Sequence, residues 1–182
     1  MGMVAPVYYT AEMVRALPAD GNRYETVHGE LSVTPAPRVW HQVVVERLHS
    51  AIAAYLRRHP EWLLFAVPAD ISWAPDVLVQ PDLFVAPVTE VRTLDWSRIR
   101  HLELVAEVLS PTTTRADRFT KRRLYQEVRI PAYWIVDGDE RFVEVWTPEA
   151  SLPTVERDRL EWRPAGAADS FGLSLPELFR PL

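Results

Sequence analysis

The chain has 182 residues with a formal net charge of −5 at pH 7, and 48% of them are hydrophobic, enough to bury a core. This composition excludes an intrinsically disordered chain, and the acidic balance excludes a generally basic protein that coats nucleic acid. Cysteine is absent, no apolar run approaches the roughly 20 residues of a membrane span, and the N-terminus lacks a signal-peptide pattern, so we expect a cytoplasmic protein without thiol chemistry or a membrane anchor.

The first elements predicted along the chain are a short helix and a hairpin. Thr10 is a plausible N-cap, and the helix that follows it ends before Pro18. Residues 23–27 and 30–33 have the pattern of two strands around the turn at 28–29. We therefore expect an N-terminal helix and hairpin over about residues 10–34.

A long helix and three strands are predicted next. Apolar residues recur at helical spacing over 39–59, and Pro60 ends that helix. Residues 63–73 and 77–85 read as strands, and residues 86–100 as a connection. Residues 102–109 form a nearly continuous apolar run, which is typical of a strand buried on both faces.

The C-terminal part predicts a loop at 110–114, a helix over about 117–128 and strands at 132–136 and 142–146 around a tight turn. The tail adds a strand at 160–163 and a helical turn at 175–179. The order of elements predicts one α/β domain over residues 1–182, a mixed central sheet flanked by helices, with its core over about 38–147.

Two acidic residues interrupt the apolar strands of the central block. Asp82 lies between apolar runs in the predicted strand 77–85, and Glu107 lies within 102–109. A carboxylate in a buried strand is costly unless it is paired, hydrogen-bonded or bound to a metal. If the two strands are neighbours, the two carboxylates form a hard-oxygen site for Mg²⁺ or Mn²⁺. The alternative is that each acid caps a strand end or pairs with an arginine.

Lys121 is the only lysine of the chain, beside 19 arginines. At about 100° per residue of helix, Leu124, Tyr125 and Val128 fall within about 60° of Lys121, whereas Arg122 and Arg123 fall on the opposite side. The lysine therefore lies on the apolar face of its helix. A buried ammonium needs partners, and carboxylates from adjacent strands are the obvious ones. The alternative is that its side chain extends past the helix end to solvent.

An aspartate, a glutamate and a lysine that converge suit phosphodiester hydrolysis. Carboxylates can hold divalent metals, which make a bound water more acidic and bind the scissile phosphate. An ammonium can orient the attacking water or stabilise the developing charge.

Several short motifs follow one another along most of the chain. They are RYE and GEL at 23–31, PAP at 35–37, HQ at 41–42, QPDL at 80–83, EVLSP at 107–111, KRRLY at 121–125 and PAYWIVD at 131–137. Each alone is weak, but together, in this order from about Thr10 to Val145, they resemble the Uma2 family (DUF820) of the PD-(D/E)XK nuclease superfamily.

The resemblance implies a restriction endonuclease-like fold with an N-terminal hairpin extension, and a Mg²⁺-dependent nuclease. The superfamily pattern falls on Asp82 and Glu107, but its third position, usually lysine, is Leu109 here. Lys121, from the following helix, is where this family is expected to supply that lysine. Thr26 and His28 also depart from the residues usual in the family's hairpin.

Weaker candidates surround these three residues. Glu46 on the long helix is a candidate additional metal ligand, or a solvated helix charge. His41 at the start of that helix could bind phosphate or support the site, or make only a local contact. Glu25 and Glu30 could reach the cleft, although hairpin acids usually face solvent. Tyr125 is expected to pack beside Lys121.

The predicted second helix carries a local basic patch in an acidic chain. We take Arg115, Arg118 and Arg122 as candidates to contact a DNA backbone, with Arg123 and Arg129 nearby. The alternative is a solvated face on which Asp117 and Glu127 pair with the arginines. The seven tryptophans favour core and oligomer-interface positions over base stacking, and a homodimer is expected.

Together these patterns predict a metal-dependent DNA endonuclease, with Asp82 and Glu107 as Mg²⁺ or Mn²⁺ ligands and Lys121 as the residue that supports the attacking water. One alternative is a catalytically weak or inactive nuclease-fold module that binds nucleic acid or a protein partner. Another is metal-assisted hydrolysis of a different phosphoester. The fold alone does not choose among them.

Overall fold

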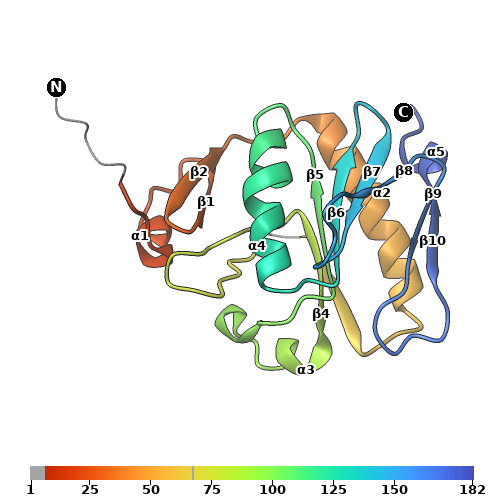
Figure 1. Cartoon of the computed structure of the whole chain (residues 1–182), viewed down its shortest axis with the longest axis horizontal. Coiled ribbons are helices and arrows are strands. Elements are labelled where there is room, and N and C mark those ends of the chain that lie inside the picture. Colours follow the sequence, from red (N-terminus) through yellow and green to blue (C-terminus); the bar gives the residue numbers. More distant parts are fainter. Residues whose placement is uncertain (1–6, 67) are drawn as a thin grey trace.

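A central mixed sheet lies between helix α4 on one face and helix α2 on the other (Figure 1). The computed structural model describes residues 7–66 and 68–182. The strand order is β3-β4-β5-β6-β7-β8, and only the β5–β6 pair is parallel. The strands are β3 (Trp62–Phe65), β4 (Leu83–Pro87), β5 (Leu104–Val108), β6 (Ala132–Asp137), β7 (Phe142–Trp146) and β8 (Thr154–Glu156). This α/β architecture with a mixed sheet is the predicted one.

Alternation along β5 decides which side chains meet each helix layer. Leu104, Ala106 and Val108 belong to the core on the side of α2, and Val105 belongs to the core that contains residues of α4. Because successive side chains of a strand point to opposite faces, Glu107 points to the same face as Val105. A strand that is apolar on both faces therefore presents its one internal acid beneath α4.

The face opposite α4 is covered by α2 (Val39–Leu56) and by the C-terminal elements. These are the hairpin of β9 (Arg159–Trp162) and β10 (Phe171–Ser174) and the short α5 (Leu175–Leu178). The rings of Trp134, Trp162 and Phe171 pack within 6.4 Å of one another, with Trp134 fully buried. This core fixes α2, which carries His41 on its first turn.

The N-terminal hairpin is joined to the chain segment that precedes β4. It consists of β1 (Arg23–Val27) and β2 (Glu30–Thr34), preceded by α1 (Ala11–Arg15) with Thr10 as its N-cap, as predicted. The backbones of Thr26 and Leu78 exchange two hydrogen bonds of 2.8 Å. As a result, β1 runs beside the polypeptide that leads to Asp82.

Two predicted strands are wrong in extent. The strand expected at 63–73 ends at Phe65, and the one expected at 77–85 begins at Leu83. Residues 71 and 79 pair with each other as an isolated bridge outside the sheet. Pro81, which has no amide hydrogen to donate, separates this bridge from β4. Asp82 therefore precedes β4 and does not lie within a strand.

The predicted second helix begins earlier than expected and is not a regular α-helix. A π-helical turn over Ala116–Lys121 leads into α4 (Arg122–Glu127). The long helix α2 ends at Leu56, three residues before the predicted end. The connection 86–100 holds two short elements, α3 (Val88–Val91) and a 3₁₀ turn over Trp96–Arg98. In the described part of the chain, no helix combines the length and the hydropathy that crossing a bilayer requires.

Candidate active site

The two acids singled out in the sequence lie opposite each other where β4 and β5 pair. Leu83 pairs with Ala106, so one step further along this antiparallel ladder Asp82 faces Glu107. The amide of Val108 donates to Asp82 Oδ2 over 2.9 Å, and the amide of Asp82 approaches Glu107 Oε2 at 3.4 Å. The end of the ladder thus fixes both carboxylates by backbone contacts.

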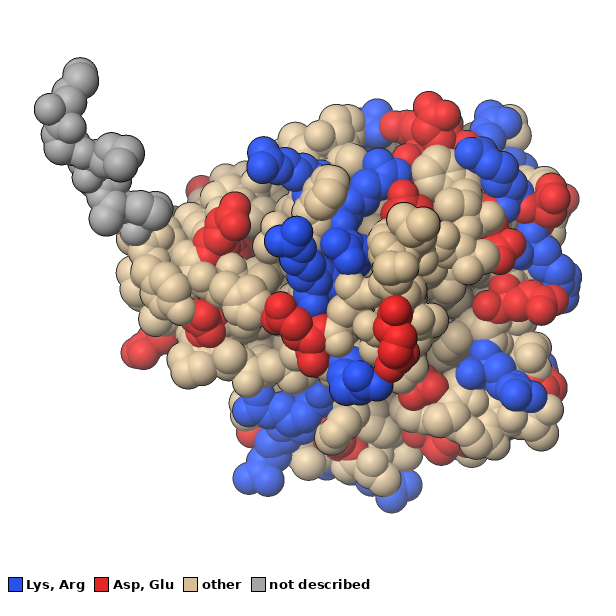
Figure 2. All heavy atoms as spheres, viewed as in Figure 1, with Lys and Arg blue, Asp and Glu red and all other residues tan. Residues whose placement is uncertain are grey.

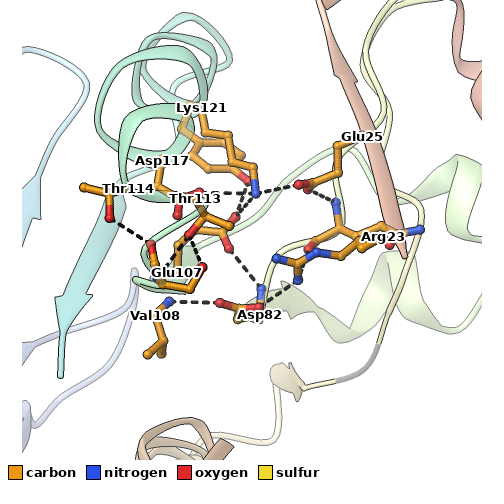
Figure 3. A network of polar contacts seen from close by, with 12 residues as sticks. Arg23, Glu25, Asp82, Glu107, Val108, Thr113, Thr114, Asp117 and Lys121 are labelled. Atoms are coloured by element: carbon orange, nitrogen blue, oxygen red, sulfur yellow. Dashed lines mark hydrogen bonds and ion pairs between the residues drawn. The ribbon is translucent and has the colours of Figure 1, made fainter. Parts of the chain in front are cut away.

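The ammonium of Lys121 is buried among three carboxylates (Figure 3). Its Nζ lies 2.9 Å from Glu25 Oε2, 3.0 Å from Glu107 Oε1 and 3.4 Å from Asp117 Oδ1. The lysine side chain is 3% exposed, and those of the three acids are 1–2% exposed. We call Lys121, Glu25, Glu107 and Asp117 the lysine cluster. Its acids come from β1, β5 and the π-helical turn.

The local chain around the π-helical turn explains how the lysine reaches this position. The loop at 110–114 closes on itself, with the Thr113 hydroxyl accepting from the Ser110 amide over 3.2 Å. The Asp117 amide then donates to the Thr113 carbonyl over 2.9 Å and starts the helix above Glu107. Asp117 and Lys121 are four residues apart, so they lie on the same side of the helix and face the sheet together.

Asp82 is held by a second set of donors. Arg23 Nη1 donates to its Oδ1 over 2.8 Å, and His41 Nε2 lies 3.1 Å from its Oδ2. The same Arg23 nitrogen also donates to the Gln80 carbonyl over 3.1 Å. Together with the Val108 amide, these contacts leave the Asp82 side chain only 6% exposed.

The hairpin contributes two neighbouring side chains to the site. Arg23 and Glu25 are two residues apart on β1, so they project from the same face of the strand. Glu25 Oε1 accepts the amide of Gln80 over 2.7 Å while its Oε2 contacts Lys121. The hairpin therefore connects the lysine cluster to the Asp82 site through one carboxylate and one guanidinium.

The charged groups of the lysine cluster shift one another's pKa values. Burial and the nearby acids raise the pKa of Glu107 to about 8, although the Lys121 ammonium opposes this rise. Burial also raises the pKa of Asp117 against the lowering effect of Lys121 and Thr113. Burial alone would lower the pKa of Lys121, but the three carboxylates raise it well above its usual value. The lysine stays charged, and the cluster holds more acid than it can neutralise.

Asp82 is shifted in the opposite direction. Burial acts to raise its pKa, but the His41 hydrogen bond and the Arg23 charge outweigh burial and hold the pKa well below the usual range. Burial lowers the pKa of Arg23, and the charges of Asp82, Glu25 and Glu107 more than reverse that effect. Asp82 is consequently an anion at neutral pH.

A cleft of about 690 Å³ opens beside Asp82 and not beside Lys121. Its polar wall includes Arg23, His41 and Asp82, and the loop at 110–113 forms part of the rim. Its apolar surface comes from Ala19, Pro35, Ala36, Pro37, Ala66, Pro68 and Pro81. A ligand in the cleft therefore meets Asp82 first, whereas the lysine cluster lies behind it.

Comparison with known proteins identifies the family and the fold of the chain. The model of the Uma2 family, described as "Putative restriction endonuclease", matches residues 11–175. The chain belongs to the Uma2 family. A solved structure of a DUF820 protein from Anabaena variabilis ATCC 29413, named as a putative nuclease, is 22% identical, with a TM-score of 0.77 over 94% of this chain and 97% of that one. This likeness establishes the fold, and no curated protein matches the chain.

The structure of this Uma2 protein brings together the three residues predicted to carry the chemistry. Lys121 contacts Glu107 directly, and Glu107 lies beside Asp82. Leu109 occupies the position where the superfamily pattern has lysine, and its side chain is buried in the core beneath α4. The helix thus supplies the ammonium that the strand lacks.

The accessory candidates divide into two groups. His41 contacts Asp82, and the Tyr125 hydroxyl donates to Glu107 Oε1 over 3.1 Å. Glu46 is exposed on α2, where it accepts from the Ser50 hydroxyl, so it does not reach the site. Glu30 is also exposed and lines a separate surface hollow beside α4.

The three arginines proposed for DNA differ in their surroundings. Arg118 forms ion pairs with Glu144 and Asp137 at 2.9 and 3.3 Å. Arg122 donates to the Arg118 carbonyl and lies over the Trp146 ring, 4.7 Å from its centroid. Arg115 is exposed at the start of the helix. Arg115 therefore has the guanidinium that is most open to solvent.

The sequence patterns did not predict two residues of the site, Asp117 and Arg23. Asp117 was considered as a partner of surface arginines, but it is 1% exposed and contacts Lys121. Its spacing of four residues from the only lysine was an available signal. Arg23 was noted only as part of a motif, and its pairing with Asp82 depends on how the hairpin docks, which the sequence does not reveal.

A metal site is not preformed by the acids. Among residues 7–66 and 68–182, no three His, Asp or Glu side chains are arranged to hold one ion. The oxygens of Asp82 and Glu107 accept hydrogen bonds from Arg23, His41 and Lys121 and from backbone amides.

Replacement of Lys121 by methionine is expected to destabilise the protein strongly. Removing one partner of a buried ion pair leaves uncompensated charge and costs about 3–5 kcal/mol. Urea denaturation followed by circular dichroism measures this loss. The double variant Lys121→Met with Glu107→Gln should recover part of the lost stability, because the second substitution removes one of the carboxylates left without a cation. The control is Arg57→Met, an exposed basic residue at the end of α2. A loss below about 1 kcal/mol, as for surface pairs, would show that the lysine cluster contributes little.

Stability is expected to depend on pH through Glu107. Its pKa is raised in the folded protein, so between about pH 4.5 and 8 the folded state binds more protons at this residue than the unfolded state. Its contribution to stability is therefore complete below the unfolded pKa and is lost as the pH rises through about 8. The groups that face it are Lys121, Tyr125 and the acids Asp82, Asp117 and Glu25.

The measurement is the free energy of unfolding of wild type and Glu107→Gln from pH 5 to 8.5. The wild-type value should fall relative to that of the variant as the pH rises, by a few kcal/mol at most. Glu46→Gln, which removes an exposed glutamate, should follow the wild-type curve. A difference that rises with pH, or stays flat, would contradict the raised pKa of Glu107.

Proposed function

We propose that this Uma2 protein is a metal-dependent nuclease that hydrolyses phosphodiester bonds in DNA, with Mg²⁺ or Mn²⁺ held by Asp82 and Glu107. The observation that carries the proposal is the excess of acid at one end of the β4–β5 ladder. Four buried carboxylates, from Glu25, Asp82, Glu107 and Asp117, meet two permanently charged cations there.

The residues present suit a divalent ion in both charge and chemistry. The ammonium of Lys121 and the guanidinium of Arg23 neutralise two of the four carboxylates, so a double positive charge would balance the rest. Carboxylate oxygens are the ligands that Mg²⁺ and Mn²⁺ prefer. The raised pKa of Glu107 reflects the same uncompensated charge. Asp82 and Glu107 lie opposite each other where β4 and β5 pair, with Asp82 at the cleft and Glu107 behind it.

In such a site, each residue around the metal would have a separate role. A bound divalent ion supplies a Lewis acid that polarises the phosphoryl oxygens and makes water more acidic. The Val108 amide and His41 fix the orientation of Asp82, and Lys121 fixes that of Glu107 from the core side. Lys121 supports the attacking water through Glu107. The reaction consumes one water, forms a bond from its oxygen to phosphorus and releases one ester oxygen as an alcohol.

The surface near the cleft offers positive charge for a DNA backbone. Figure 2 shows Arg side chains over the face that α4 presents, with Asp and Glu side chains among them. Arg115, exposed at the start of the helix, lies two residues beyond the cleft residue Thr113. Arginines bind phosphate through charge-assisted hydrogen bonds, and a local patch can act in a chain of net charge −5.

The first test is cleavage of plasmid and branched DNA in the presence of Mg²⁺ or Mn²⁺. Wild type should cut, and Asp82→Asn, Glu107→Gln and Lys121→Ala should lower the rate about 100-fold or more, as for the loss of other charge-stabilising groups in active sites. Chelation with EDTA should abolish cutting. Glu46→Gln should cut at the wild-type rate. A wild type that is inert on every form of DNA, or acid variants that cut equally well, would refute the assignment.

A second function is favoured by one observation, namely that the Asp82 carboxylate is already satisfied by Arg23, His41 and an amide. In that case the protein is a non-catalytic module that binds nucleic acid or a protein partner through the same cleft. Calorimetric titration with Mn²⁺ separates the two. The nuclease should bind Mn²⁺ and gain thermal stability with increasing ion concentration, and Asp82→Asn should lose both effects. A folded wild type that binds no Mn²⁺ would favour the module.

A further inference from the structure

Two permanently charged side chains, Lys121 and Arg23, lie in the site. They differ in how many of their N–H donors have a partner within the described chain. The Lys121 ammonium has three N–H donors and three carboxylate partners within 3.4 Å. It is 2% exposed and does not line the cleft. Its contact with Glu107 is a hydrogen bond, and those with Glu25 and Asp117 are ion pairs. The protein encloses this ammonium on the side of the core, so a substrate in the cleft does not reach it.

Arg23 has donors to spare. A guanidinium carries five N–H donors, and both hydrogen bonds of this side chain leave from Nη1. Its Nε is enclosed and has no acceptor among the described residues. Nη2 also makes no hydrogen bond within the described chain, and unlike Nε it is not enclosed. The donors that a phosphate in the cleft can reach are therefore those of Nη2.

The position of Arg23 puts these donors next to the proposed reaction. Arg23 lines the cleft together with Asp82 and His41, and its side chain is 23% exposed. Its guanidinium is 2.8 Å from Asp82 (Figure 3), so an anion bound to it would lie beside the acid proposed to hold the metal.

We propose that Arg23 of the N-terminal hairpin is the cation that contacts the substrate phosphate, and that Lys121 is a positioning residue that acts through Glu107. This proposal rests on the proposed function for its substrate, a nucleic-acid phosphodiester. It assigns the hairpin a direct part in substrate binding, because β1 supplies Arg23. It also explains why this position carries a forked guanidinium and the buried one a compact ammonium.

The test is DNA binding without turnover. A fluorescein-labelled 20-base-pair duplex is titrated with the protein in EDTA, and the dissociation constant is measured by fluorescence anisotropy over a series of salt concentrations. Arg23→Gln should weaken binding about tenfold, the effect of losing one good charge-assisted contact. It should also reduce the slope of log affinity against log salt by about 0.9, the value for one phosphate contact on duplex DNA.

Matched variants distinguish the loss of a phosphate contact from a loss of folding stability. Arg23→Lys keeps one charge but loses the fork, so its affinity should lie between those of wild type and Arg23→Gln while the salt slope is retained. Arg57→Gln, at an exposed arginine at the end of α2, should leave both quantities unchanged. If Arg23→Gln fails to fold, Arg23→Lys alone decides, because an affinity equal to that of wild type would overturn the proposal.

The outcomes distinguish this proposal from the proposed function. If wild type cuts DNA and Arg23→Gln, folded by circular dichroism, binds with unchanged affinity and salt slope, the nuclease stands and the role of Arg23 is refuted. If wild type cuts nothing but Arg23→Gln loses affinity and slope, the phosphate contact stands without the nuclease. If wild type binds no DNA, both are refuted.

Discussion

The site depends on one buried ammonium that holds three carboxylates from separate parts of the chain. Glu25, Glu107 and Asp117 come from the hairpin, the central sheet and the π-helical turn, and each lies within 3.4 Å of Lys121. Without a shared cation, these acids would repel one another in a region where water cannot screen them. The ammonium therefore links the hairpin, the sheet and the π-helical turn. It contacts the side chain of Glu107, whose place beside Asp82 is set by the pairing of β4 and β5.

The hairpin is as much a part of this arrangement as the sheet. Thr26 pairs with Leu78, which places Arg23 and Glu25 over the segment that leads into β4. Because alternate residues of a strand share a face, a single short strand delivers one cation to Asp82 and one acid to Lys121. The site thus consists of two linked halves: an enclosed one around the lysine, and an open one around Asp82 at the cleft.

Much of this could be predicted from periodicity. Glu107 and Asp82 were identifiable because each is an acid next to apolar strand sequence, and Lys121 because it is the only lysine and lies on the apolar face of its helix. The mixed sheet and the positions of α2 and β7 also followed from apolar spacing. These features depend on neighbours in the sequence, which a pattern can reveal.

What could not be predicted depends on packing between distant segments. Nothing near Arg23 in the sequence indicates that it meets Asp82, which is 59 residues away. The strand ends at Phe65 and Leu83 are set by pairing partners and by Pro81. Between them, Ala69, Ile71, Val77 and Val79 belong to the core beneath α4 without being part of the central sheet. Glu30 and Glu46 resembled site acids only by type, and their side chains face solvent.

The solitary lysine gives this molecule a built-in chemical reporter. Every other basic side chain is a guanidinium or an imidazole, so apart from the α-amino group the protein has a single primary amine, and that amine is enclosed. Reagents that acylate amines can reach it only when α4 or the hairpin lifts from the sheet. The rate at which one label is incorporated therefore records how often the site opens, without any engineered probe.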